Sequence, residues 1–440
     1  MLQQTIIMNQ IKLILSSYVL PIILVLSIVI FPKTTFAAEG DGDIPDHLIG
    51  GLNLGVDDSK GKEARALFLV NPDTQEVWNF PLTNIPGGPI LGQGMHTAIA
   101  PDKKSFYVTM GGNESLPLRL EKFDIEWDKG QPSLSLASEE ELVPANTETV
   151  FGWGSDEPNT IQEAHGLNID PTQKYLMWSN LNSHSVEVFD LAGDKLLTEP
   201  ITDDTVYTPH GLFSNPSGTL AVTPNYAYGN QTATIWDLED GIPNFRKTVK
   251  MSDSGIEGAW PHMAEWIDDE HFLLPSGHET IDNPANNYEA GLWLCDVSED
   301  NCRNLIGETN LKHPQDGVIK GVSDLVWKKT DDGIRVYVGE GNFLQKDAGG
   351  NPVKGYISVW DFDPDSDEPA QFVKRFSPGF NGLPVAYRDT HGMCRQNDRA
   401  YTMSFASNYL IELDLDSDTI SNVYDRDDGL ILPHGVSCSA

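Results

Sequence analysis

The phrase Pro209-His210-Gly211-Leu212 decides the fold, because close copies of it recur along the chain. In each copy a His opens a short apolar run, and a turn such as Asn215-Pro216-Ser217-Gly218 usually follows before a second apolar run. The other copies are Met95-His96-Thr97-Ala98, Ala164-His165-Gly166-Leu167, Pro261-His262-Met263, Thr390-His391-Gly392-Met393 and Pro433-His434-Gly435-Val436. Successive histidines in these phrases are 69, 45, 52, 129 and 43 residues apart.

This spacing indicates an all-β repeat. A period of about 45 residues with strand-like apolar runs is typical of a β-propeller, in which each repeat forms one blade. The 129-residue gap suits two enlarged blades. Within it, residues 321–327 (Gly-Val-Ser-Asp-Leu-Val-Trp) occupy the place of the phrase without a His. Counting that copy, the sequence predicts seven blades.

The two ends of the chain complement each other. Residues 66–70 and 76–80 read as two strands with no His phrase before them, and the last His phrase at 433–436 has no outer strands after it. We therefore expect the C-terminal strand to pair with the N-terminal strands and to leave no open sheet edge around the ring. The predicted organisation is a seven-bladed β-propeller over 50–440, preceded by a flexible leader at 38–49.

The first residues have the character of an export signal. Lys12 precedes a largely apolar run from Leu13 to Phe31, and small residues follow as far as Ala38. This pattern predicts a signal peptide over 1–37, although 19 mostly apolar residues could also remain as an uncleaved anchor. We expect an exported protein, in a periplasm, outside the cell or on its surface, with no membrane contact once the signal is removed.

The charge balance argues against one class of partner. The chain has 29 Lys and Arg against 65 Asp and Glu, a formal net charge of −36. Removing the predicted signal makes it more acidic, because that segment holds two lysines and no acid. Such a surface repels phosphate backbones, so we expect no nucleic-acid partner.

Four cysteines suit an oxidising compartment. Cys295 and Cys302 flank a polar turn between two short strands, which predicts a disulfide across a hairpin. Cys394 and Cys438 follow His391 and His434 by three and four residues, on strands expected to be neighbours. They could form a second disulfide or a pair of thiolate metal ligands, and the disulfide is favoured because both lie below the histidines.

The repeated histidines predict a metal site. The innermost strand of every propeller blade runs along the central channel, so one repeat position should face one channel mouth in each blade. Neutral imidazoles gathered there are ligands that copper and zinc prefer. The alternative is a structural His that bonds a neighbouring blade, but six matched positions among eleven histidines favour metal. The predicted ligands are His96, His165, His210, His262, His391 and His434.

Other polar residues are expected near the same mouth. Asp324 stands beside the His position of the blade that lacks a His, and Glu163 precedes one His phrase, so either could bind metal or accept a proton. Residues expected in loops at this mouth could orient ligands or contact substrate, or could simply be solvated: His184, His278, Asn225, Glu340 and Asn342. The remaining histidines, His47, His271 and His313, are expected at the surface.

These phrases resemble those of the YVTN-type seven-bladed propellers and, among them, of exported copper enzymes. The chain is similar to the propeller domain of nitrous oxide reductase, to thiocyanate dehydrogenase and, more distantly, to methanethiol oxidase of the selenium-binding protein family. The resemblance covers the repeat pattern over 50–440 and is specific at the His phrases. In those families inner-strand histidines hold copper at the channel mouth, which implies the same role for the six matching histidines here.

The chain also departs from those families. It has no His-His pair at the first position, no cupredoxin domain and none of the cysteine motifs of selenium-binding proteins. The resemblance therefore implies an oxidoreductase with one to three copper ions that acts on a small sulfur- or nitrogen-containing molecule and passes electrons to an external acceptor.

Two rival functions remain open at this point. The first is a hydrolase or lyase in which the same ring holds zinc or manganese. The second is a non-enzymatic binding or scaffold propeller. Acid-rich turns such as 361–367 could in addition hold calcium, although a solvated hairpin explains them as well.

Overall fold

The computed structural model describes most of one compact unit, Gly42–Ala440. It describes residues 44–439 apart from 54–55, 58–61, 64–65, 86–92, 112–117, 144–149, 152–157, 160–163, 182, 207, 226–231, 252–260, 277–290, 307–311, 314–316, 319–321, 342–353, 389, 391 and 405–406. The predicted signal peptide at 1–37 lies outside the described residues. Among those described, no helix is long and apolar enough to cross a membrane.

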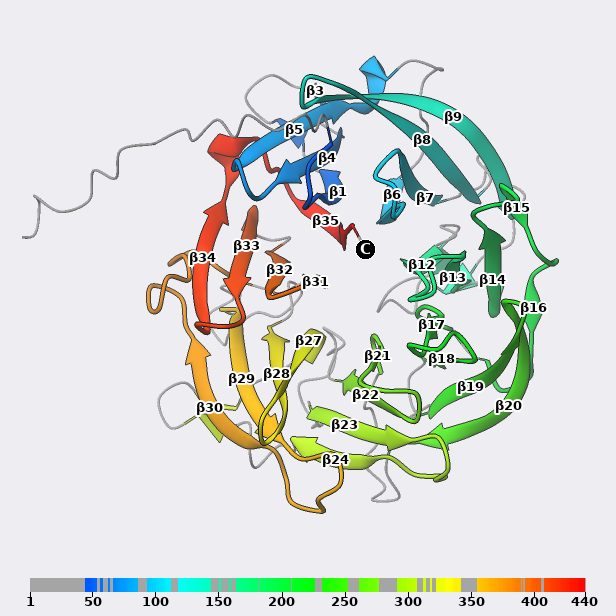
Figure 1. The fold of residues 1–440 in the computed structure, drawn as a ribbon, viewed down its shortest axis with the longest axis vertical. Coiled ribbons are helices and arrows are strands. Elements are labelled where there is room, and N and C mark those ends of the chain that lie inside the picture. The colour runs from blue at the N-terminus through cyan, green and yellow to red at the C-terminus, as the bar shows by residue number, and fades with distance from the viewer. Residues whose placement is uncertain are drawn as a thin grey trace, which may run out of the picture. The chain divides into compact units, whose positions relative to one another are not determined.

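Seven antiparallel sheets stand around a central axis as the blades of a propeller (Figure 1). In sequence order, the strands of the first four blades, innermost first, are these. Blade 1 contains β6 (Gln93–Ile99), β7 (Ser105–Gly111), β8 (Leu118–Asp128) and β9 (Gln131–Val143); blade 2 contains β12 (Ala164–Ile169), β13 (Tyr175–Asn180), β14 (Ser185–Asp190) and β15 (Lys195–Leu196), with β16 (Ile201–Thr202) also on β14. Blade 3 contains β17 (Phe213–Ser214), β18 (Leu220–Pro224), β19 (Thr232–Glu239) and β20 (Ile242–Lys250); blade 4 contains β21 (Glu265–Trp266), β22 (His271–Ser276), β23 (Gly291–Asp296) and β24 (Arg303–Ile306).

The remaining three blades follow the same order. Blade 5 contains β27 (Val322–Thr330), β28 (Gly333–Glu340), β29 (Tyr356–Phe362) and β30 (Gln371–Phe376); blade 6 contains β31 (Met393–Gln396), β32 (Arg399–Ser404), β33 (Tyr409–Asp414) and β34 (Thr419–Tyr424); blade 7 contains β35 (Pro433–Cys438), β1 (Ile49–Asn53), β4 (Ala66–Asn71) and β5 (Glu76–Pro81). Outside the blades are the hairpins β2 (Val56–Asp57) with β3 (Lys62–Glu63), β10 (Val150–Phe151) with β11 (Pro158–Asn159) and β25 (Lys312–His313) with β26 (Gly317–Val318), and the 3-10 turns η1 (Leu82–Asn84) and η2 (Arg426–Asp428). The prediction of a seven-bladed all-β propeller is confirmed.

Blade 7 closes the ring by joining the two ends of the described chain. The C-terminal strand β35 is its inner strand and pairs antiparallel with β1, placing His434 opposite Leu52. The predicted closure is confirmed, but the strand β1 was not predicted, and its first residue, Ile49, lies in the segment predicted as a flexible leader. Its glycines serve packing: a Cβ on Gly50 would lie 2.7 Å from the ring of Phe106, and one on Gly51 would lie 2.5 Å from that of Phe68.

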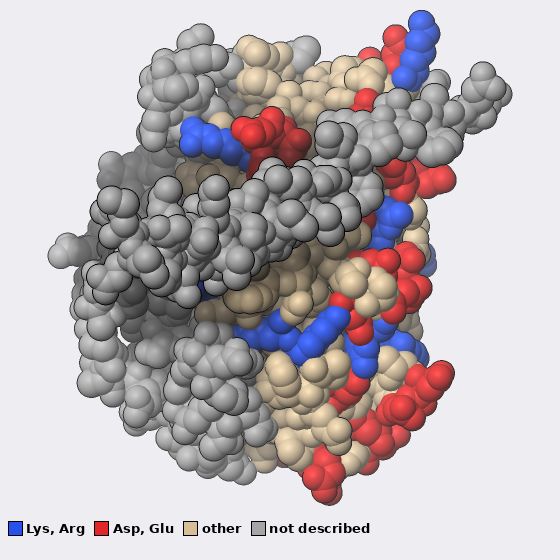
Figure 2. Space-filling model, turned by 90° about the vertical axis from the view of Figure 1, so that its left-hand side faces the viewer, with Lys and Arg blue, Asp and Glu red and all other residues tan. Residues whose placement is uncertain are grey.

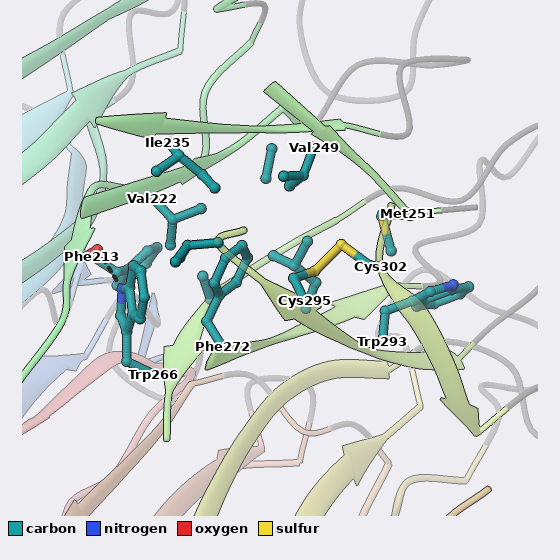
Figure 3. Packing of buried hydrophobic residues seen from close by; sticks show 14 of the residues in the cluster. Phe213, Val222, Ile235, Val249, Met251, Trp266, Phe272, Trp293, Cys295 and Cys302 are labelled. Atoms are coloured by element: carbon teal, nitrogen blue, oxygen red, sulfur yellow. Dashed lines mark hydrogen bonds between the residues drawn. A yellow bond between two sulfur atoms is a disulfide. The ribbon is translucent and has the colours of Figure 1, made fainter. Parts of the chain in front are cut away.

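Apolar side chains pack between neighbouring blades. Figure 3 shows the cluster between blades 3 and 4, in which Phe213 and Trp266 lie near Phe272 and the Cys295–Cys302 disulfide lies farther out. That disulfide is the one predicted across the β23–β24 hairpin. The amide of Cys302 donates to the carbonyl of Lys250 at 2.7 Å. The disulfide-bonded hairpin of blade 4 therefore pairs with the end of β20, the outer strand of blade 3, and covers part of that exposed sheet edge.

The surface keeps the acidic character of the composition. In the view of Figure 2, Asp and Glu gather along one edge of the described surface, with a shorter band of Lys and Arg beside them. Some of these charges pair across blades. Arg335 of blade 5 bonds Asp361 of its own blade at 2.7 Å and also pairs with Asp418 of blade 6.

Candidate metal centre

Five of the six predicted histidine ligands come together at one end of the central channel. His96 and His165 lie within the inner strands β6 and β12, and His434 lies within β35. His210 and His262 directly follow the bridge residues Pro209 and Pro261, just ahead of β17 and β21. These five residues are called the histidine layer below. The sixth, His391, lies outside the described residues.

The rings of the histidine layer follow one another around the channel. The Nε2 atom of His96 lies 3.2 Å from Nδ1 of His165. Ring centroids are 4.3 Å apart between His165 and His210, and 4.1 Å apart between His210 and His262. On the other side, the centroids of His96 and His434 are 5.6 Å apart. The repeat position therefore does place its histidines in mutual contact.

Glycines after the histidines allow this crowding. A Cβ on Gly166 would lie 2.4 Å from the Cα of Gly211, so blades 2 and 3 could not approach as they do with any larger residue. Gly166 and Gly211 also have φ of +62° and +112°, values that side chains with a Cβ rarely adopt. The repeated His-Gly sequence therefore supplies an imidazole and also the small residue that lets the neighbouring blade approach it.

Most of the histidine layer is buried, and burial favours the neutral form of His96. His165 and His210 are each 1% exposed, and His262 is 4% exposed. Burial lowers the pKa of His96 well below its usual value, and the nearby imidazoles of His165, His434 and His262 lower it further. A neutral imidazole has a ring nitrogen free to donate its lone pair to a metal ion.

Asp324 of blade 5 lies directly after the repeat position at which this blade has no histidine. It is 3% exposed, and its Oδ2 accepts the amide of Gly392 at 2.8 Å. Its Oδ1 lies 3.9 Å from Nδ1 of His262. The carboxylate thus sits at the edge of the histidine layer, as the sequence predicted.

The other candidates divide into three groups. Glu163 and His278 lie outside the described residues, as does Asn342. Glu340 and Asn225 are buried rather than solvated: Glu340 bonds Arg375 at 2.7 Å, and Asn225 donates to Thr232. His184 lies apart from the layer, where burial lowers its pKa and its Nδ1 accepts the amide of Thr208 at 3.1 Å.

Imidazoles and a carboxylate are donors that suit copper or zinc, but in this arrangement the side chains do not point at a common centre. Among the residues that the structure describes, no three His, Cys, Asp or Glu converge as a ready metal-binding group. The rings of His210 and His262 are tilted by only 37° at 4.1 Å, so they stack rather than aim their nitrogens at one point. Small rotations of the rings would be needed to bind an ion, for which buried neutral imidazoles and a carboxylate are suitable donors.

The second cysteine pair is a disulfide, so the alternative of two thiolate ligands is wrong. Cys394 and Cys438 are bonded, with Cα atoms 5.7 Å apart, and they join inner strands β31 and β35 below the histidine layer. The bond ties blade 6 to the strand that closes the ring.

Sequence reasoning missed the space below the histidines. A cavity of about 420 Å³ extends along the channel from His96, His262 and His434. Its walls include residues that follow the histidines by a few positions, such as Thr97 and Asn168. No motif marks these positions, because their side chains act on the backbone of the neighbouring blade.

Comparison with known proteins supports the fold alone. No protein-family profile and no curated protein sequence matches the chain. The periplasmic gluconolactonase of Pseudomonas aeruginosa is 14% identical with a TM-score of 0.56, covering 89% of this chain and 99% of its own. A protein from Lactobacillus plantarum is 12% identical with a TM-score of 0.53, covering 89% and 98%. Hydrazine synthase of Kuenenia stuttgartiensis is 12% identical with a TM-score of 0.50, covering 77% and 89%.

Proposed function

We propose that the protein is an exported copper-dependent oxidoreductase that acts on a small sulfur- or nitrogen-containing molecule at the histidine layer. The observation that carries the proposal is the contact of five repeat-related imidazoles from five different blades, with centroids of successive rings 4.1 to 5.6 Å apart. A propeller needs no such cluster for stability, since apolar clusters between its blades already hold it together.

In this proposal the inner strands hold the ligands and the blades fix their spacing. His96, His165, His210, His262 and His434 would bind one to three copper ions, which supply one-electron transfer when bound. Asp324 would hold the His262 side of the layer and would accept a proton from a reactant there. Buried neighbours exclude bulk water from His165 and His210. Electrons would leave to an external acceptor.

Metal content by mass spectrometry tests the proposal. The full chain is expressed for export and purified without chelator or nickel, beside His210→Ala, His434→Ala and the control His271→Ala. His271 is a suitable control because it pairs with Asp268 at 3.1 Å, away from the layer. We expect one to three coppers per chain, lost in the first two variants and kept in the control.

Two results would change the assignment. Stoichiometric zinc or manganese would favour a hydrolase or lyase on the same ring. An absence of metal, even after copper is supplied, would overturn the catalytic proposal and favour a binding propeller.

Asp324 provides a finer test of the layer. Asp324→Asn should weaken metal binding about 10- to 100-fold, because outer carboxylates orient and polarise the histidines that bind metals. A matched control is Asp296→Asn, since Asp296 lies 3.7 Å from His271 in a similar pair outside the layer. Competition titrations with a chromophoric chelator measure both affinities. Equal metal affinities in the two variants would show that Asp324 does not contribute to metal binding.

A further inference from the structure

The channel below the histidine layer is open space rather than packed core. The cavity of about 420 Å³ has walls from all seven inner strands and the turns that follow two of them. At its upper end lie His96, His262 and His434 with Asp324. At its outer end lie Pro171 and Pro216, which are exposed in the turns after β12 and β17. This space is called the lower channel below.

Side chains bond across every junction between neighbouring blades around this channel. Thr97 donates to the carbonyl of Gly435, and His96 contacts His165 at 3.2 Å. The remaining links, in order around the ring, are Asn168 to Leu212 O at 2.8 Å, Trp266 to Phe213 O at 2.8 Å, Trp327 to Trp266 O at 3.0 Å, Arg395 to Trp327 O, and Gln396 to Ser439 O at 2.7 Å. Together they form a closed belt of seven contacts.

The belt explains why the channel does not collapse. Protein interiors normally pack without voids larger than a water molecule, because each lost contact costs dispersion energy. Here the polar side chains are committed to neighbouring backbones, and small residues such as Ala98, Ala264 and Ser214 leave the axis empty. Its wall also includes hydroxyl and amide groups that can bond water.

The passage ends at the part of the layer that a reactant would have to reach. His165 and His210 are almost fully buried and do not line it, whereas His96 and His434 are partly exposed and do. At the outer end, the exposed Arg395 lies over the ring of Trp327 at 5.4 Å, so a cation stands at the rim.

We propose that the lower channel is the route by which metal ions and small polar reactants reach the histidine layer, from the face that carries Pro171 and Pro216. The inference deepens the proposed function and rests on it for the identity of what enters. The belt then acts as a frame that keeps the route open.

A covalent plug tests the route. All four native cysteines are in disulfides, so a single introduced cysteine can be labelled selectively. Pro216→Cys is labelled with fluorescein maleimide, and Ser217→Cys is the matched control in the same exposed turn that does not line the channel. The readout is the rate of Cu²⁺ uptake by metal-free full-length protein.

We expect the label at position 216 to slow Cu²⁺ uptake about tenfold or more, and the label at 217 to leave it nearly unchanged. Equal uptake rates in the two labelled proteins would overturn the route. A wild-type protein that takes up no copper would instead count against the proposed function.

A second measurement tests the route without any metal. Ser214→Cys and Ala264→Cys place thiols in the channel wall, and Ser276→Cys places one in a buried position of β22 that does not line the channel. The probe is a small methanethiosulfonate reagent. We expect both channel thiols to react at least about tenfold faster than the thiol at 276, because reactivity follows access. Equal rates would show that the channel is closed and would overturn the inference whatever the metal result.

Discussion

The histidine layer and the lower channel are built from the same inner strands, yet they have opposite packing. In the layer, His165 and His210 are buried ring against ring at 4.3 Å. Three residues after His165, Asn168 of the same strand turns its amide to the backbone of blade 3, and the axis beside it is open. The position of a residue along the inner strand therefore decides whether its side chain packs in the histidine layer or bonds the neighbouring blade beside the lower channel. Substitutions in the layer and in the channel wall should have different effects.

The largest effect should come from the disulfide that joins blades 6 and 7 in the channel wall. Replacing Cys394 and Cys438 by Ser should lower the free energy of unfolding by about 4 kcal/mol, because the bond closes a 44-residue separation. Replacing Cys295 and Cys302 should cost about 2 kcal/mol, since that bond closes only 7. Urea unfolding of both double variants measures the difference. Equal losses would mean that the length of the closed loop does not determine what each disulfide contributes.

A glycine substitution should break the layer directly. Gly166→Ala should destabilise the protein by about 3 kcal/mol, because the new Cβ meets the Cα of Gly211 and the backbone has a positive φ. The matched control is Gly130→Ala, whose φ is +75° but which has no atom within 4 Å of the new Cβ. It should cost only about 1 kcal/mol. Similar losses in urea unfolding would show that blades 2 and 3 can separate without penalty.

Much of this architecture could be predicted from the sequence because it depends on period and phrase. The spacing of the histidines gave seven blades, and the incomplete ends gave the closure by β35. The sequence also predicted that Asp324 lies near the histidines, and its carboxylate is 3.9 Å from His262. The blade count follows from a phrase repeated along the chain, the closure from the incomplete first and last repeats, and the place of Asp324 from the copy of the phrase that has no His.

The rest depends on contacts that leave no local pattern. The strand β1 was not predicted because two glycines make its sequence resemble a loop. These glycines are needed to make room for Phe68 and Phe106, which lie elsewhere in the sequence. The buried partner of Glu340, Arg375, is 35 residues away. Apart from the contact between His96 and His165, the belt joins side chains to backbone carbonyls. Every residue has a backbone carbonyl, so no sequence motif indicates these bonds.

The belt itself should show a moderate effect. Asn168→Leu keeps the number and branching of the side-chain heavy atoms but removes donors to the carbonyls of Gly166 and Leu212, at 2.7 and 2.8 Å. We expect a loss of about 2 kcal/mol in urea unfolding, because partly buried carbonyls lose their partners. Asn244→Leu, on exposed outer strand β20, should change stability by no more than about 0.5 kcal/mol. An equally small loss at 168 would mean that water replaces the belt.

The smallest effect should be a pH dependence from the lower channel. Burial raises the pKa of Glu265 to about 7, against the opposing influence of Arg395. An acid whose pKa is higher in the folded state binds a proton on folding, so the stability it contributes is present below about pH 4.5 and is lost as the pH rises through 7.

Glu265→Gln should therefore flatten the decline in unfolding free energy between pH 4.5 and 7, by about 1 kcal/mol once the partial exposure of Glu265 is allowed for. Urea unfolding at several pH values measures the slope, with Glu299→Gln in the exposed turn of blade 4 as the control. A slope unchanged by Glu265→Gln would mean that water in the lower channel solvates this carboxylate as well as bulk solvent does. The effect of burial that raises the pKa of Glu265 would then be cancelled by that water.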